Sequence, residues 1–307
     1  MASQHGDERN KPISRKNSLS GRWNKRWTEK ELAARIRRGF GQGEGCFYLP
    51  WISTRDTASI GVATRLWSPK TGRTMHFLSL VERDAFLWFE FRQDFWDYQE
   101  QKPIERRLSL AAATELGVRH PFYKSDAKTP YVMTVDGVVT LVSTDGKEFT
   151  KTAVDCKFDL SKENPASLQR LAITAKACEL MNVEHIIITR AELDKQEISN
   201  ILWARGGFKR TGESFIPGLF DDWPQVMLKE LRTHLGGSGD DSISASEFCQ
   251  EFDARNRLPK GAAIRILKIL VWNHWVETEM AGEEIIRRPL SSLRLVAPPQ
   301  TQRGEPC

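Results

Sequence analysis

The stretch YVMTVDGVVTLVSTDGKEFTKTAVDCKF, residues 131–158, predicts two strands joined by a tight turn. Its two halves are rich in β-branched and apolar residues, which are enriched in strands. Asp145-Gly146 between them is typical of a two-residue type I′ turn. A hairpin centred on this dipeptide places Asp136 directly opposite Asp155. Because side chains alternate between the two faces of a strand, Asp155 and Lys157 are expected to share one face with Asp136.

Two carboxylates about 5 Å apart across a strand pair repel each other and destabilise the sheet unless a cation lies between them. Mg²⁺, with Mn²⁺ as a substitute, prefers such hard oxygen ligands. Lys157, expected opposite Thr134, adds a point charge suited to a phosphate or to its attacking water. The alternative is that Asp155 forms a surface ion pair with Lys157 or Lys151 and that Asp136 caps a turn.

Glu82 is the third acidic candidate. Ser79 has the chemistry of a helix N-cap. The helix expected from there to about Phe91 carries too many apolar residues for a surface helix. Glu82 in its first turn is therefore expected to be buried or to line a cleft. The alternative is an ion pair with Arg83 or Arg106.

The composition sets limits on the class of protein. At 307 residues, of which 40% are hydrophobic, the chain is long enough for a substantial core and two domains. It has neither a long apolar stretch nor a secretory signal, so we expect no membrane span and a cytoplasmic location. Its five cysteines include no CxxC pair, which argues against a disulfide framework and a structural zinc site. Any metal ion is expected to have oxygen ligands.

Positive charge is concentrated at the N-terminus. Residues 1–38 contain eleven lysines and arginines and four acidic residues, a net charge of +7, whereas the whole chain carries +5. A basic arm over residues 1–26, polar and without expected secondary structure, is followed closely by Trp27. This combination is typical of a segment that contacts nucleic-acid phosphates. The alternative is a solvated leader that contacts nothing.

The remaining patterns alternate between helices and strands and predict an α/β domain, a mixed sheet flanked by helices. The capping box Thr28-x-x-Glu31 predicts a helix that stops at Gly39. The glycine-rich loop 39–45 follows a helix and lacks Gly-Lys-Ser/Thr, so we expect no nucleotide site there. The other expected elements are strands over 62–67 and 74–77, a strand near Tyr98, a helix over 108–116, a helix over 166–181, a strand over 185–189 and a helix over 195–205.

Helices dominate the chain after Gly206. The expected elements are helices over 225–235 and 261–272, a helix opened by the capping box Ser244-x-x-Glu247, and short strands over 275–279 and 284–288. Three helices with a short hairpin predict a small winged-helix-like domain. Arg265 and Lys268 on the last helix are candidates for DNA contact, and the alternative is a solvated charged face.

A series of short motifs runs through the first two thirds of the chain: AARIR (33–37), GQG (41–43), YLPW (48–51), KTGR (70–73), HFLSLVE (76–82), QEQKP (99–103), GVRHP (117–121), MTVD (133–136) and AVDCK (153–157). Together, over about residues 29–190, they resemble the TnsA family, the endonuclease subunits of heteromeric transposons. The resemblance implies a restriction-endonuclease-like fold. It also implies an enzyme that cuts the non-transferred strands at the 5′ ends of a transposon.

By position, the resemblance implies a set of site residues: Glu82 and Asp136 as metal-binding carboxylates, Asp155 as the third ligand, Lys157 as the catalytic lysine, and the backbone carbonyl of Cys156 as a further ligand. This assignment agrees with the hairpin register. The chain departs from the family at two points. Well-known relatives carry Gln where Asp155 stands, and some carry a Glu near Thr174, where this chain has none.

The resemblance predicts a Mg²⁺-dependent endonuclease that hydrolyses DNA phosphodiesters to a 3′-hydroxyl and a 5′-phosphate. The implied partners are double-stranded DNA at the transposon ends, a DDE transposase (TnsB) and an AAA+ regulator (TnsC). The expected parts of the chain are a basic arm (1–26), a restriction-endonuclease-like catalytic domain (27–205), a helical winged-helix-like docking domain (206–290) and a tail (291–307). The alternatives are a stand-alone restriction or repair nuclease and a non-catalytic DNA-binding assembly protein.

Overall fold

The computed structural model describes residues 27–56, 62–123, 126–208, 216, 218–236 and 243–296. The basic arm expected over residues 1–26 and the tail from residue 297 onward lie outside these ranges. Within them, none of the helices combines the length and the apolar character needed to cross a membrane.

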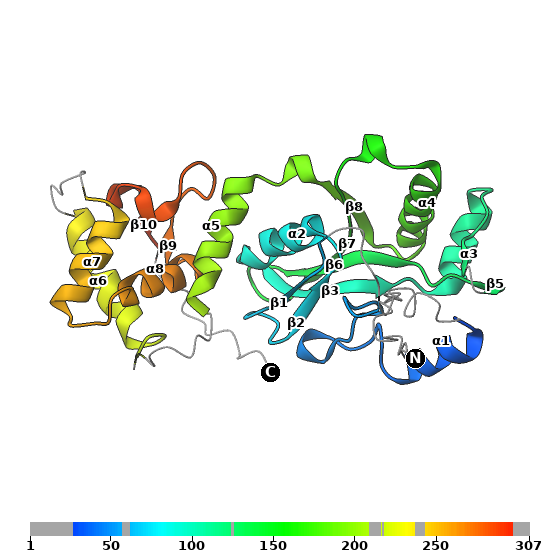
Figure 1. The fold of residues 1–307 in the computed structure, drawn as a ribbon, viewed down its shortest axis with the longest axis horizontal. Coiled ribbons are helices and arrows are strands. Elements are labelled where there is room, and N and C mark those ends of the chain that lie inside the picture. Colours follow the sequence, from blue (N-terminus) through cyan, green and yellow to red (C-terminus); the bar gives the residue numbers. More distant parts are fainter. Residues whose placement is uncertain are drawn as a thin grey trace, which may run out of the picture.

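Four strands form the central sheet, in the order β3–β6–β7–β8. β3 (Phe95–Pro103), β6 (Thr134–Val142) and β7 (Phe149–Lys157) pair antiparallel, whereas β8 (Glu184–Thr189) runs parallel to β7. The sheet is therefore mixed, as predicted, and helices lie around it in Figure 1.

The β6–β7 hairpin has the predicted register. Gly137 pairs with Val154 at the open end of the ladder. Extending this pairing by one residue places Asp136 opposite Asp155, because antiparallel partners advance together in opposite directions. The two acidic residues are thus held at the end of the paired region.

The turn of this hairpin differs from the prediction. A type I′ turn needs a positive φ at both central residues, and of Asp145 and Gly146 only the glycine has one, 74°. The Ser143 N–H donates to the Glu148 carbonyl at 2.9 Å, which closes a longer loop. The register survives because the longer loop has the same centre as the predicted one.

Helices cover both faces of the sheet, an arrangement compatible with a restriction-endonuclease-like fold. α2 (Leu80–Phe91) and α5 (Lys195–Arg205) pack on one face, against side chains that include Val139, Val154 and Cys156. α3 (Arg106–Glu115) and α4 (Pro165–Leu180) pack on the other face, against side chains that include Val135 and Ala153. All four helices were predicted, with ends that differ by two residues or fewer.

The N-terminal elements pack onto this core. α1 (Glu29–Arg37) begins with the predicted capping box of Thr28 and Glu31. The remaining pairs are β1 (Thr64–Trp67) with β2 (Thr74–Phe77), as predicted, and β4 (Phe122–Tyr123) with β5 (Asp126–Pro130).

The glycine-rich loop after α1 packs closely against β3. A Cβ atom on Gly41 would lie 2.4 Å from Cγ of Pro103, and one on Gly43 would lie 2.5 Å from the Phe47 carbonyl oxygen. The Gln99 side chain donates to the Gly43 carbonyl at 2.9 Å. These glycines therefore permit close packing onto the sheet.

The C-terminal region contains α6 (Asp222–Gly236), α7 (Ala245–Arg255) and α8 (Ala262–Trp272), all of which were predicted. A two-stranded sheet follows, β9 (Val276–Glu277) paired with β10 (Arg294–Leu295). The strand predicted over 284–288 is wrong, because Ile285–Arg287 form a 3-10 helix. The winged-helix arrangement stays a prediction.

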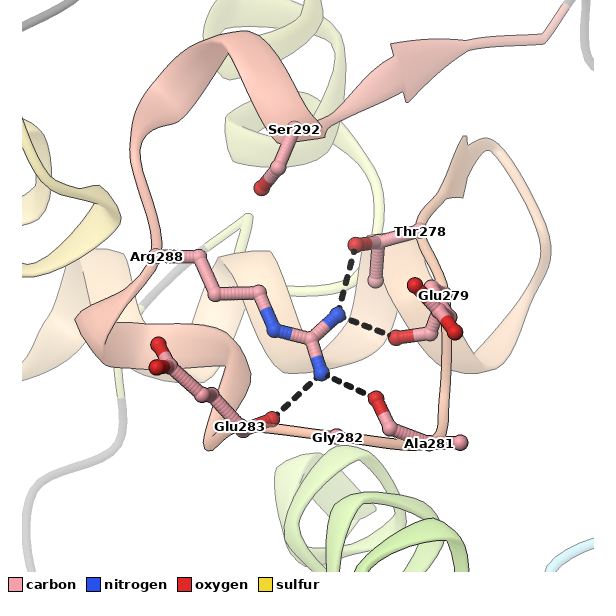
Figure 2. A pocket seen from close by; sticks show the side chains of 7 residues that line it. All are labelled: Thr278, Glu279, Ala281, Gly282, Glu283, Arg288 and Ser292. Atoms are coloured by element: carbon pink, nitrogen blue, oxygen red, sulfur yellow. Dashed lines mark hydrogen bonds between the residues drawn. The ribbon is translucent and has the colours of Figure 1, made fainter.

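Arg288 explains why no hairpin forms at Ala281-Gly282. Its buried guanidinium donates to the Thr278 hydroxyl and to the carbonyl oxygens of Glu279, Ala281 and Glu283 (Figure 2). Three carbonyls that converge on one guanidinium do not point in the alternating directions that a strand ladder needs. The same loop lines an adjoining pocket of about 390 Å³. Both terminal nitrogens of Arg288 are already occupied by the hydrogen bonds described above.

α5 lies between the sheet and the C-terminal helices (Figure 1). Its Asn200 side chain donates to the carbonyls of Met280 and Glu283, at 2.9 Å each. At its end, Arg205 donates to the buried Glu90 carboxylate at 2.8 Å. One cluster of buried apolar side chains runs from the sheet through α5 to α8. The predicted boundary at residue 205 therefore falls within continuous packing, and the division into two domains stays a prediction.

Candidate active site

Glu82 lies in the first turn of α2 and is buried, as predicted. The Ser79 hydroxyl caps the helix by accepting the Glu82 N–H at 3.1 Å. The Glu82 Oε2 atom accepts the Leu78 N–H at 2.9 Å. Burial raises the pKa of Glu82, and these local hydrogen bonds oppose the increase only in part. The helix start therefore fixes one carboxylate at the sheet.

Asp136 lies on β6 and is half-buried. Its Oδ2 atom accepts the backbone N–H of Cys156 at 2.8 Å. Burial raises the pKa of Asp136 well above its usual range, and the charges of Glu82 and Asp155 raise it further. Asp136 therefore experiences the carboxylate repulsion that the hairpin register predicted.

Gln101, which was not among the predicted site residues, joins the first two carboxylates. This buried residue of β3 places its Nε2 atom 3.4 Å from Glu82 Oε2 and 3.3 Å from Asp136 Oδ1. Its φ is 49°, a left-handed conformation that is uncommon for a non-glycine residue. Such strain costs about 1–3 kcal/mol and concentrates at functional sites. The only sequence signal was its place in the QEQKP motif.

Asp155 is buried on β7 and is held by a histidine. Its Oδ2 atom lies 2.9 Å from His185 Nε2, and its Oδ1 atom accepts the Asp136 N–H at 3.4 Å. His185 comes from the neighbouring strand β8, where it pairs with Ala153. The sequence pattern predicts a strand at this histidine but no role for it, because only the pairing of β8 with β7 brings it to Asp155.

Lys157 is the last residue of β7. Its ammonium group has no ion pair or hydrogen bond to another of the described residues. Burial raises the pKa of both Glu82 and Asp136, and the positive charge of Lys157 opposes part of that increase. The predicted lysine therefore lies near the carboxylates and forms no ion pair with any residue that the structure describes.

Cys156 is buried between the two acidic positions of the hairpin. Burial and the neighbouring carboxylates, Asp136 first among them, raise the pKa of its thiol well above the usual value. The thiol is therefore neutral. Its backbone N–H binds Asp136, and ligation by its carbonyl stays a prediction.

Tyr98 covers this cluster from β3. It is fully buried, and among the described residues its hydroxyl has no hydrogen-bond partner. Burial raises the pKa of Tyr98 well above its usual value, and Cys156 and Asp136 add to the effect. A Cβ atom on Gly137 would lie 2.0 Å from the Tyr98 hydroxyl oxygen. The glycine after Asp136 is therefore needed for the ring to fit.

Among the residues that the structure describes, the ion pairs that were the alternative to a metal site do not form. Three of the four basic residues that could have neutralised the candidate carboxylates pair with other acids: Arg83 with Asp84, Arg106 with Glu29 and Lys151 with Glu44. None of these pairs involves Glu82, Asp136 or Asp155.

The candidate DNA contacts on α8 are engaged within the protein. Arg265 Nε donates to the Gly207 carbonyl at 3.0 Å, and Lys268 Nζ lies 5.3 Å from the centre of the Trp203 ring. Both side chains therefore contribute to the packing of α8 against α5 and the residues that follow it.

Glu82 and Asp136 fit a divalent cation by the chemistry of their donors. Each directs a carboxylate oxygen, a hard ligand, at the same amide nitrogen, and each has a raised pKa that a nearby cation would lower. The described part of the chain contains no ready-made group of three His, Cys, Asp or Glu ligands. The amide of Gln101 lies between two of the carboxylates, and His185 binds the third.

No protein-family model matches this chain. The chain is similar to the transposon Tn7 transposition protein TnsA of Escherichia coli, with 26% identity over 254 residues, which are 83% of this chain and 87% of that protein. A match of this length extends past the motifs of residues 29–190 and includes residues on both sides of Arg205. The chain is a TnsA-like protein.

Proposed function

We propose that this TnsA-like chain is the endonuclease subunit of a transposase. It would be a Mg²⁺-dependent phosphodiester hydrolase, with Mn²⁺ as a substitute, that cuts the non-transferred strands at the 5′ ends of a transposon during cut-and-paste transposition. The observation that carries the proposal is the meeting of Glu82 and Asp136 at one amide nitrogen, with Lys157 beside them.

Glu82 and Asp136 would hold the metal ion, with Asp155 and the Cys156 carbonyl as further ligands. The chemistry that a bound ion would supply is polarisation of the scissile phosphate and a lower pKa of the attacking water. The other roles belong to the chain itself. Lys157, which forms no ion pair within the described ranges, orients the water and offsets negative charge on the phosphate as the bond to the leaving oxygen breaks. The products are a 3′-hydroxyl and a 5′-phosphate.

The burial and closeness of Glu82 and Asp136 also favour the cation-bound site over the empty site. Burial and repulsion raise the pKa values of Glu82 and Asp136, so the two anions are costly to maintain without a cation. A divalent ion removes that cost, and this difference favours the loaded form of the site.

The similarity to a transposition protein supports a proposal about partners. We propose double-stranded DNA at the transposon ends, a DDE transposase (TnsB) and an AAA+ regulator (TnsC), with the C-terminal helices as the docking surface for the regulator. Removal of everything after Arg205 would uncover the apolar face of α5, so substitutions on the surface test docking better. Lys229 and Arg232 are exposed on α6, and their replacement by Glu is expected to reduce pull-down by the regulator while leaving the fold intact.

A strand-cleavage assay tests the proposal. A duplex that carries a transposon end is incubated with this protein and Mg²⁺ or Mn²⁺, with and without the transposase and the regulator. Cleavage at the 5′ end that requires the partners supports the proposal, whereas cleavage without partners identifies a stand-alone nuclease. Absence of cleavage by the complete mixture would identify a non-catalytic assembly protein.

Variants connect the activity to the site. Glu82→Gln and Asp136→Asn are expected to reduce cleavage at least about 100-fold, because each removes a ligand charge while keeping the shape of the side chain. Asp145→Asn, in the exposed turn of the same hairpin, is the matched control and is expected to cleave at the wild-type rate. Wild-type rates in both site variants would refute the assignment.

A further inference from the structure

Gln101 occupies a position that its backbone does not favour. It lies on β3 between residues that pair with Gly137 and Val135 of β6, so it stands opposite Asp136. Its positive φ departs from strand geometry at this one residue, while Glu100 and Lys102 on either side stay paired with β6. In this conformation its carbonyl accepts the Trp51 N–H at 3.3 Å. The unfavourable backbone conformation of Gln101 thereby brings its long, flexible side chain between Glu82 and Asp136.

The orientation of the amide is determined by a third contact. The Thr134 hydroxyl donates to Gln101 Oε1 at 3.3 Å, so the oxygen of the amide faces away from the acids. The NH₂ group then faces Glu82 Oε2 and Asp136 Oδ1, at 3.4 and 3.3 Å. One donor group therefore binds one oxygen of each carboxylate at once.

We propose that Gln101 is a positioning residue that takes the place of the metal ion between Glu82 and Asp136 before the ion binds. Its amide holds the two carboxylates at the correct site in the metal-free protein. It must then withdraw, because an amide donor and a cation cannot share the same oxygen lone pairs. The inference rests on the proposed function, since it needs a cation that binds these two carboxylates.

The direction of the effect separates this role from a purely structural one. A residue that competes with the ion weakens metal binding, so its removal tightens binding. A residue that only supports the site strengthens metal binding, so its removal weakens binding. The loss of one hydrogen bond to a charged group corresponds to about a tenfold change in affinity.

The experiment measures Mn²⁺ binding to the full-length protein without DNA, by calorimetry and by electron paramagnetic resonance. Gln101→Gly removes the amide and tolerates the positive φ. Gln101→Asn keeps the amide group on a side chain that is one methylene shorter. Asn also tolerates a positive φ, so this variant is expected to fold. Gln99→Asn is the matched control, because Gln99 is a buried glutamine of the same strand that donates to the Gly43 carbonyl instead of to the site.

We expect Gln101→Gly to bind Mn²⁺ about tenfold more tightly than the wild type, with a larger rise in melting temperature on adding the ion. The Mn²⁺ affinity of Gln101→Asn is expected to lie between those of Gln101→Gly and the wild type, and the affinity of Gln99→Asn is expected to equal that of the wild type. Equal or weaker binding by both Gln101 variants, with normal binding by the wild type, would overturn the inference and leave the proposed function standing. If neither the wild type nor any variant binds Mn²⁺, both the inference and the proposed function fail.

Discussion

Replacement of Asp136 by Asn is expected to stabilise the metal-free protein while it destroys the metal site. In the folded protein, burial and the charges of Glu82 and Asp155 raise the pKa of Asp136. A carboxyl group with a raised pKa binds its proton more tightly in the folded than in the unfolded state. The free energy of unfolding is then highest below about pH 4, near the unfolded pKa of Asp, and falls as the pH rises through the folded pKa. An asparagine side chain at this position does not titrate and avoids this loss.

The expected size follows from the contacts. Each unit by which the fold raises the pKa of Asp136 costs about 1.4 kcal/mol at neutral pH. Asn keeps one oxygen that can accept the Cys156 N–H, now bound at 2.8 Å. Its NH₂ group then faces the NH₂ group of Gln101, so the hydrogen bond from Gln101 to this side chain is lost, which costs about 1 kcal/mol. We therefore expect Asp136→Asn to raise the free energy of unfolding by about 1–3 kcal/mol at pH 8.

The assay is urea unfolding of both proteins in chelator at several pH values from 4 to 8. The gain in stability should be absent near pH 4, where Asp136 is protonated, and should grow toward pH 8. Asp145→Asn serves as the control, because local hydrogen bonds lower the pKa of Asp145, and it should show no such growth. A variant that is less stable than the wild type at pH 8, by an amount independent of pH, would refute the reasoning about repulsion.

Three further predictions test other parts of the molecule. Lys157→Gln is expected to lose cleavage while it keeps Mn²⁺ binding, because the lysine is assigned to the water and the phosphate; calorimetry showing weaker Mn²⁺ binding would contradict this role. Gly137→Ala is expected to lower the free energy of unfolding by about 1–3 kcal/mol or more, since the new Cβ would lie 2.0 Å from the Tyr98 hydroxyl; an unchanged thermal midpoint would show that the ring moves easily. Deletion of residues 1–26, which carry seven basic and two acidic residues, is expected to weaken DNA binding most at low salt and to flatten its salt dependence; an unchanged slope would identify a solvated leader.

Local signals in the sequence were sufficient for most of the secondary structure. The capping boxes at Thr28 and Ser244 mark the starts of α1 and α7, because the N-cap hydroxyl accepts the N–H of the Glu three residues later and that Glu side chain accepts the N-cap N–H. The hairpin register was predictable for a similar reason. It depends on the centre of the loop, so it survived an incorrect turn type at Asp145-Gly146.

The same local reasoning failed where a distant side chain decides the backbone. The strand predicted over 284–288 has a suitable pattern, but the buried guanidinium of Arg288 draws the preceding carbonyls inward. Arg265 and Lys268 have the spacing of a charged helix face, and the structure adds contacts with Gly207 and Trp203, while both side chains stay partly exposed and DNA contact stays a prediction. Neither contact can be seen in a local window of sequence.

The residues of the candidate site likewise fall into those that the sequence indicated and those that only the structure revealed. The sequence by itself identified Glu82, Asp136, Asp155 and Lys157, because acidic residues on an apolar helix and on opposed strand positions are chemically conspicuous. Only the tertiary structure added Gln101 and His185, which reach the carboxylates from β3 and β8. Glutamine and histidine are ordinary residues in a strand, and a positive φ leaves no mark in the sequence. Their roles arise from strand order and backbone conformation, which are decided by packing across the whole sheet.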